Sequence, residues 1–88
     1  MSDLVNKLRY RSHYRGCREN DHLLGGFADK YLVTFTEKQL IQFADILELE
    51  DNDLLSWMLG YQPVPPKYCN EVMMLLLEYA KIQAQHSI

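Results

Sequence analysis

Apolar residues recur at helical spacing along nearly the whole chain, and this periodicity constrains the fold more than any other feature. In one segment Leu40, Phe43, Ala44 and Leu47 follow the i, i+3, i+4, i+7 pattern of an amphipathic helix. No segment shows the alternation of a half-buried strand, and no repeat recurs at a fixed period. A chain of 88 residues has room for one domain. The sequence therefore predicts an all-α fold, a compact five-helix bundle, with a single domain over residues 1–88.

Two glycine positions shape the first two expected helices. Ser2 can cap a helix that runs to about Tyr14, and Gly16 then ends this helix or starts the next one. The second helix carries an apolar stripe over residues 23–31 and contains the pair Gly25-Gly26. Glycine inside a helix costs about 1 kcal/mol relative to alanine. We therefore expect the pair to mark close packing against a neighbouring helix, although a kink would also account for it.

The remaining three helices have recognisable starts. Thr36 opens the third with a capping box, in which its hydroxyl accepts one free amide and the Gln39 side chain returns to another. Asp51 is predicted to cap a short fourth helix that ends at Gly60. Three prolines then predict an extended connector. The last helix is expected over residues 67–83, followed by a frayed tail.

Two apolar features are interpreted as core. The last expected helix is apolar on most sides, which is typical of a central core helix. Trp57 falls on the same stripe as Leu54. We interpret it as a core residue, although an exposed tryptophan would suit an interface.

The termini and the cysteines indicate the cellular compartment in which the protein works. No apolar run approaches the roughly 18 residues that span a membrane, and the N-terminus lacks the apolar stretch of a secretory signal. Met1 stands directly before the first helix, so we expect a cytoplasmic bacterial protein, or a mitochondrial matrix protein if the chain is a processed eukaryotic form. Cys17 and Cys69 have no metal-ligand spacing and suit reduced thiols, while a disulfide between them stays open.

Charge is distributed unevenly along the chain, whose net charge is −3. Five basic residues face one acid through Arg18, whereas nine acids face two lysines from Glu19 to Gly60. The basic end suits an acidic partner surface or a phosphate. The whole chain does not have the charge profile of a nucleic-acid-binding protein.

The boundary between these regions falls on Arg15, Gly16 and Glu19. On a continuous helix Arg15 and Glu19 would form a surface pair worth about 0.3 kcal/mol, in the less favourable order. If Gly16 instead starts a helix, Glu19 lies in the first turn, where the helix dipole favours an anion. Arg15 would then project from the corner with its donors free for a partner. The predicted partner-binding residues are Arg15, Gly16, Glu19, Arg11, Arg18 and Asp21.

Two competing sites lie in the same stretch. A metal or catalytic site would draw on four residues, His13, Cys17, Glu19 and His22. Gly16 breaks the helix face that would unite them, and no metal or catalytic residue is predicted. The cations and tyrosines between Arg9 and Arg18 suit a nucleic-acid helix. The acidic half of the chain would repel phosphate.

Two segments resemble the signatures of one family. Residues 15–19 match R-G-x-x-E, with an acidic position and an apolar helix after it, and residues 51–57 match D-x-D-L-x-x-W. On these segments the chain resembles the small FAD assembly factors of succinate dehydrogenase, which occur in bacteria and mitochondria. The resemblance covers nearly the whole chain. His22 departs from it, because the family is usually apolar there.

The resemblance implies a compact five-helix domain that is not an enzyme. No Gly-rich phosphate loop is present, and we expect no stably bound cofactor, while direct contact with FAD stays open. Family members bind the flavoprotein subunit of succinate dehydrogenase, and in bacteria often that of fumarate reductase, and promote covalent attachment of FAD to a histidine of that subunit. Arg15, Gly16 and Glu19 would carry the contact. We expect a monomer that neither inserts into a membrane nor binds nucleic acid. The alternatives are a helical adaptor with a different client or, further off, a nucleic-acid-binding module.

Overall fold

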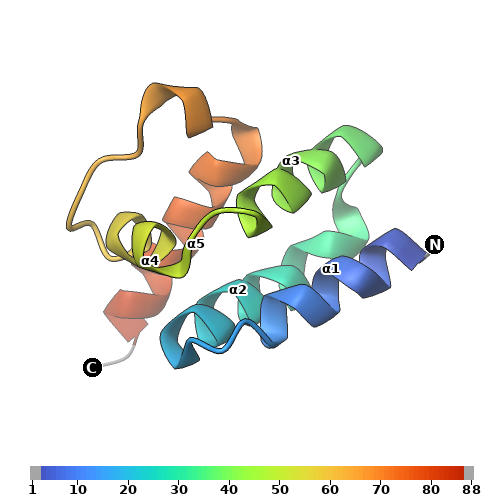
Figure 1. Cartoon of the computed structure of the whole chain (residues 1–88), viewed down its shortest axis with the longest axis horizontal. Coiled ribbons are helices and arrows are strands. Elements are labelled where there is room, and N and C mark those ends of the chain that lie inside the picture. Colours follow the sequence, from blue (N-terminus) through green and yellow to red (C-terminus); the bar gives the residue numbers. More distant parts are fainter. Residues whose placement is uncertain (1–2, 87–88) are drawn as a thin grey trace.

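Helices make up most of the part of the chain that the structure describes. A computed structural model describes the backbone of residues 3–86 and the side chains of residues 3–84. Within this range no strand occurs, which confirms the all-α prediction (Figure 1). The α-helices are α1 (Asp3–His13), α2 (Arg18–Tyr31), α3 (Glu37–Leu47), α4 (Asp51–Met58) and α5 (Glu71–His86), and two short 3-10 helices are η1 (Leu32–Thr34) and η2 (Pro66–Tyr68).

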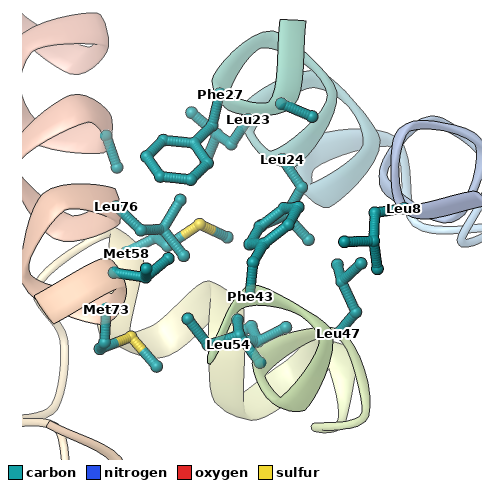
Figure 2. Close-up of a cluster of buried hydrophobic side chains, with 14 of the residues drawn as sticks. Leu8, Leu23, Leu24, Phe27, Phe43, Leu47, Leu54, Met58, Met73 and Leu76 are labelled. Atoms are coloured by element: carbon teal, nitrogen blue, oxygen red, sulfur yellow. The ribbon is translucent and has the colours of Figure 1, made fainter. Parts of the chain in front are cut away.

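The helices surround one core. α1 and α2 run antiparallel along one side, and α3 leads from them to α4 and α5 (Figure 1). α2 contacts α1, α4 and α5, and α5 contacts α2, α3 and α4, so the centre is shared by α2 and α5. Phe27 of α2 and Phe43 of α3 are fully buried, with ring centroids 5.5 Å apart. Figure 2 shows side chains from all five α-helices meeting here.

Two expectations for the core are confirmed, one of them in part. Trp57 is buried in the same core as Leu54 and is not an exposed interface residue. Val72 and Leu76 of α5 are fully buried, as expected of a core helix. The outer side of α5 is nevertheless exposed at Met74, so this helix is less enclosed than its apolar composition suggests.

Local capping chemistry sets several boundaries as expected. The capping box at α3 is present: the Gln39 amide donates to Thr36 Oγ1 at 3.2 Å, and the Thr36 amide donates to Gln39 Oε1 at 2.9 Å. The break at Gly16 is also present, because α1 ends at His13 and α2 begins at Arg18. The expected cap at Ser2 lies outside the described residues.

Three predicted boundaries were wrong. Asp51 does not cap α4: Glu50 occupies the N-cap position without a side-chain cap bond, and the Asp51 side chain bonds elsewhere. The last helix begins at Glu71, not near Lys67, because η2 occupies residues 66–68. The Asn70 side chain then accepts the Met73 amide at 2.8 Å, as an N-cap asparagine does. The helix also extends past residue 83 to His86.

The Gly25-Gly26 pair lies at two close helix contacts, as predicted. A Cβ on Gly25 would lie 2.6 Å from Nδ1 of His13, at the end of α1. A Cβ on Gly26 would collide with the Tyr79 hydroxyl of α5. The two glycines therefore let α2 approach helices on two of its sides.

Gly26→Ala is expected to destabilise the chain by about 1–2 kcal/mol, because overpacking outweighs the helix propensity gained. Tyr79 cannot easily yield, since its ring packs edge-on against Phe27. The double variant Gly26→Ala/Tyr79→Phe removes the colliding oxygen and should regain most of the loss. Urea unfolding of the wild type and the two variants measures this. Equal stability of Gly26→Ala and the wild type would show that the contact is loose.

Candidate partner-binding surface

The α1–α2 junction, residues 14–17, is a tight corner. Gly16 has φ of +93°, in the left-handed region that favours glycine, and Cys17 is extended at the N-cap of α2. The backbone amide of Arg15 donates to Asp21 Oδ1 at 2.7 Å, which ties the corner to the first turn of α2. A Cβ on Gly16 would meet no atom within 4 Å. This residue therefore presents bare backbone at the surface.

Arg15 points into the molecule, so the prediction that it projects from the corner was wrong. Its Nε donates to Asp51 Oδ1 at 2.6 Å, and its Nη1 and Nη2 donate to the carbonyls of Leu47 and Leu49, each at 2.7 Å. The side chain is only 12% exposed. The last carbonyls of a helix lack partners within it, and a guanidinium fork satisfies several acceptors at once. Arg15 thus fixes the corner to the α3–α4 connection.

Asn20 completes this internal network. It is fully buried, and its Nδ2 donates to Asp51 Oδ1 at 2.9 Å and to the Asp51 carbonyl at 3.0 Å. Asn20 was not predicted from the sequence as a site residue. A signal was present, because Asn20 lies three residues before Leu23 and four before Leu24, on the buried face of α2.

The Asp51 carboxylate is held in its charged form. Partial burial raises its pKa, but hydrogen bonds from Arg15 and Asn20, with the positive charge of Arg15, outweigh that effect and leave the pKa below its ordinary value. A group whose pKa is lowered by folding stabilises the fold above its unfolded pKa, about 3.9 for aspartate, and loses that contribution as the pH falls.

The stability difference between the wild type and Asp51→Asn is therefore expected to be largest near neutral pH and to shrink below about pH 4, as the wild-type carboxylate is protonated. Urea unfolding at a series of pH values measures it. A difference that stays constant down to the acid limit would contradict a charged Asp51 in the fold.

The outer side of the junction consists of different residues. Arg18 and Glu19 are exposed, and Glu19 lies in the first turn of α2, as predicted. Arg11 forms a surface ion pair with Glu48, in which Nη2 and Oε2 are 2.6 Å apart. Asp21 is half-buried, and its Oδ1 accepts the hydrogen bond from the Arg15 amide. We define the exposed corner as residues 16–19. Of the other predicted residues, Arg15 and Asp21 flank this corner, and Arg11 lies on α1, paired with Glu48.

The competing sites receive little support. His13 Nε2 lies 3.1 Å from Asp29 Oδ1, and Cys17 is a free thiol, as is Cys69. Among the described residues no group of three or more His, Cys, Asp or Glu side chains could hold a metal ion. For nucleic acid, three of the four arginines between residues 9 and 18 face acids of the chain itself: Arg9 Nε is 3.6 Å from Asp29 Oδ1, and Arg11 and Arg15 are paired as above. No described helix is long and apolar enough to cross a bilayer.

Comparison with known proteins agrees with the resemblance noted in the sequence. A family model described as the flavinator of succinate dehydrogenase matches residues 6–80, which include the exposed corner and all of α4. The chain belongs to this family. The match confirms that the two signature segments identify it correctly.

Curated relatives of this family come from bacteria and mitochondria. The chain is 40% identical over 77 residues to succinate dehydrogenase assembly factor 2-A, mitochondrial, of Drosophila ananassae, covering 85% of this chain and 49% of the relative. It is 31% identical over 77 residues to the FAD assembly factor SdhE of Acetobacter pasteurianus, covering 88% and 71%. A mitochondrial assembly factor 2 of Dictyostelium discoideum is 38% identical over 78 residues, covering 89% and 55%. The chain thus spans about half the length of the insect relative.

Proposed function

We propose that this chain is an assembly factor that binds the flavoprotein subunit of succinate dehydrogenase and promotes covalent attachment of FAD to a histidine of that subunit. The proposal extends to the flavoprotein subunit of fumarate reductase. The observation that carries it is the family match over residues 6–80, together with an exposed corner inside that match. In this proposal the chain acts as a monomer, in the bacterial cytoplasm or the mitochondrial matrix, and performs no chemistry itself.

The exposed corner suits protein contact. The absence of a side chain at Gly16 lets a partner backbone approach closely. The Glu19 carboxylate, exposed in the first turn of α2, is placed to accept charge-assisted hydrogen bonds from partner donors at a dried interface. Arg15 contributes by fixing the corner and does not supply a free guanidinium.

Binding of this kind can promote flavinylation without a catalytic group on the factor. Covalent attachment requires the flavin ring and the acceptor histidine to be held in a near-attack geometry. A small rigid domain that binds one arrangement of its client more tightly than others raises the population of that arrangement. The internal network of Arg15, Asn20 and Asp51 gives the corner the required rigidity.

Glu19→Ala is expected to weaken binding of the flavoprotein subunit by about 1 kcal/mol or more, the range of an interface hot spot. Isothermal titration calorimetry with the purified subunit measures it. Glu37→Ala is the matched control, because Glu37 is likewise an exposed glutamate in a first helical turn, that of α3. It should bind as the wild type does. Unchanged affinity of Glu19→Ala would remove Glu19 from the interface.

The same titration separates the proposed function from an adaptor with another client. A wild-type chain that shows no affinity for the flavoprotein subunit, but retains a different protein in a pull-down, would favour the adaptor. Binding that falls steeply with salt and requires a nucleic acid would favour the third class of function.

A further inference from the structure

We propose that Asp51 is a positioning residue for the exposed corner: one carboxylate at the start of α4 holds both ends of residues 16–19 in the arrangement that binds the partner. The inference rests on the proposed function and adds to it a residue outside the corner. It assigns Asp51 a role in binding that it exerts through Arg15 and Asn20.

The exposed corner lies between two residues whose side chains bond to Asp51. Arg15 immediately precedes Gly16, and Asn20 immediately follows Glu19. Both side chains donate to the same oxygen, Asp51 Oδ1, from Arg15 Nε at 2.6 Å and from Asn20 Nδ2 at 2.9 Å. Because α4 is itself fixed in the core through Leu54, the two bonds tie the corner to a rigid part of the fold.

The carboxylate makes a contribution that the other acceptors of Arg15 cannot replace. The carbonyls of Leu47 and Leu49 bind the guanidinium but make no bond to Asn20. Asp51 joins Arg15 and Asn20 to α4, whereas the bond of the Arg15 amide to Asp21 Oδ1 connects the corner only to α2. The charge of Arg15 favours the ionised form of Asp51. Loss of the carboxylate should therefore loosen residues 16–19 more than the rest of the chain.

Asp51 is 33% exposed, so a direct contact with the partner is the competing explanation. A double-mutant cycle separates the two, because residues that act through one network have non-additive effects. Affinity for the purified flavoprotein subunit is measured by calorimetry for Asp51→Ala, Arg15→Ala and the double variant. We expect Asp51→Ala to weaken binding about tenfold. The loss in the double variant should be smaller than the product of the two single losses, because both single variants remove the Arg15–Asp51 bond. Losses that multiply in the double variant, or wild-type affinity of a folded Asp51→Ala, would overturn the proposal.

A second measurement needs no partner. In the free chain the Arg15 amide donates to Asp21 Oδ1 and the Asp21 amide donates to the Cys17 carbonyl. Hydrogen exchange of these two amides should accelerate about tenfold in Asp51→Ala, while the amides of α5 keep their wild-type protection. Asp53→Ala is the control, since Asp53 is an exposed acid in the same helical turn. It should exchange and bind as the wild type does. Unchanged exchange at the Arg15 and Asp21 amides would contradict the positioning role whatever the binding result.

Asp51→Asn decides the matter if Asp51→Ala fails to fold, because the asparagine keeps an acceptor and loses only the charge. A smaller acceleration, confined to the Arg15 and Asp21 amides, with affinity between those of the wild type and Arg15→Ala, supports positioning. An exchange pattern identical to the wild type contradicts it. If the wild type shows no affinity for the flavoprotein subunit while these two amides respond to the variants, the proposed function fails and the assignment of Asp51 to the corner stands.

Discussion

Gly16→Arg is expected to abolish detectable binding of the flavoprotein subunit while the chain remains helical and melts cooperatively. A side chain at this position would occupy the space where a partner backbone approaches. The side chain would not collide with the chain itself, since a Cβ at position 16 has no atom within 4 Å. The backbone φ of +93° adds strain of about 1–2 kcal/mol for a residue with a side chain. A domain of ordinary stability tolerates that cost.

Gly60→Arg is the matched control for this prediction. Gly60 also has a positive φ, +80°, and open space around its Cβ position, but it lies at the end of α4. The control should lose about as much stability as Gly16→Arg and keep wild-type affinity. Calorimetric titration and circular dichroism melts measure the two properties. Loss of binding in both variants, or unfolding of Gly16→Arg alone, would make Gly16 a structural residue and not a contact.

Arg15→Ala is expected to cause the largest loss of folding stability among the junction variants, about 2–4 kcal/mol. It leaves a partly buried carboxylate on Asp51 without its cation, and removes the side-chain donors to two carbonyls. The lower end of this expected loss falls below the cost of breaking a fully buried ion pair, because the Asp51 side chain is a third exposed. Urea unfolding followed by circular dichroism gives the value.

Two neighbouring variants test whether this loss comes from the network. Arg11→Ala removes an ion pair of similar length, but both partners are exposed, at 38% and 68%, so the change should stay within about 1 kcal/mol. Arg15→Lys keeps the positive charge without the planar fork that reaches three acceptors, and should recover only part of the stability. A loss in Arg15→Ala no larger than in Arg11→Ala would contradict a structural role for Arg15.

The helices could be predicted because their signals are local. The Thr36 capping box and the apolar stripe of α3 place that helix where the structure has it. The Gly25-Gly26 pair predicted close packing, since glycine inside a helix needs a compensating contact. The late start of α5 was not predicted, because a 3-10 turn after a proline connector and the cap at Asn70 follow a stretch that also suits a helix.

The candidate site was only partly predictable, and the reason lies in Arg15 and Asp51. An aspartate before a helix is usually a cap, and an arginine at a helix end usually faces solvent. Here two such residues, 36 positions apart, satisfy each other instead, and a local pattern carries no information on that pairing. Glu19, whose placement depends only on its position after Gly16, is exposed as expected.

Covalent flavin on the client tests the central claim most directly. The flavoprotein subunit is expressed in cells that lack their own FAD assembly factor, alone or with the wild-type chain, Gly16→Arg or Gly60→Arg, and in-gel fluorescence reads the flavin bound to the denatured subunit. We predict a strong fluorescent band with the wild type and Gly60→Arg, and a weak band without the chain or with Gly16→Arg. Equal fluorescence in all four samples, at equal amounts of subunit, would contradict the account.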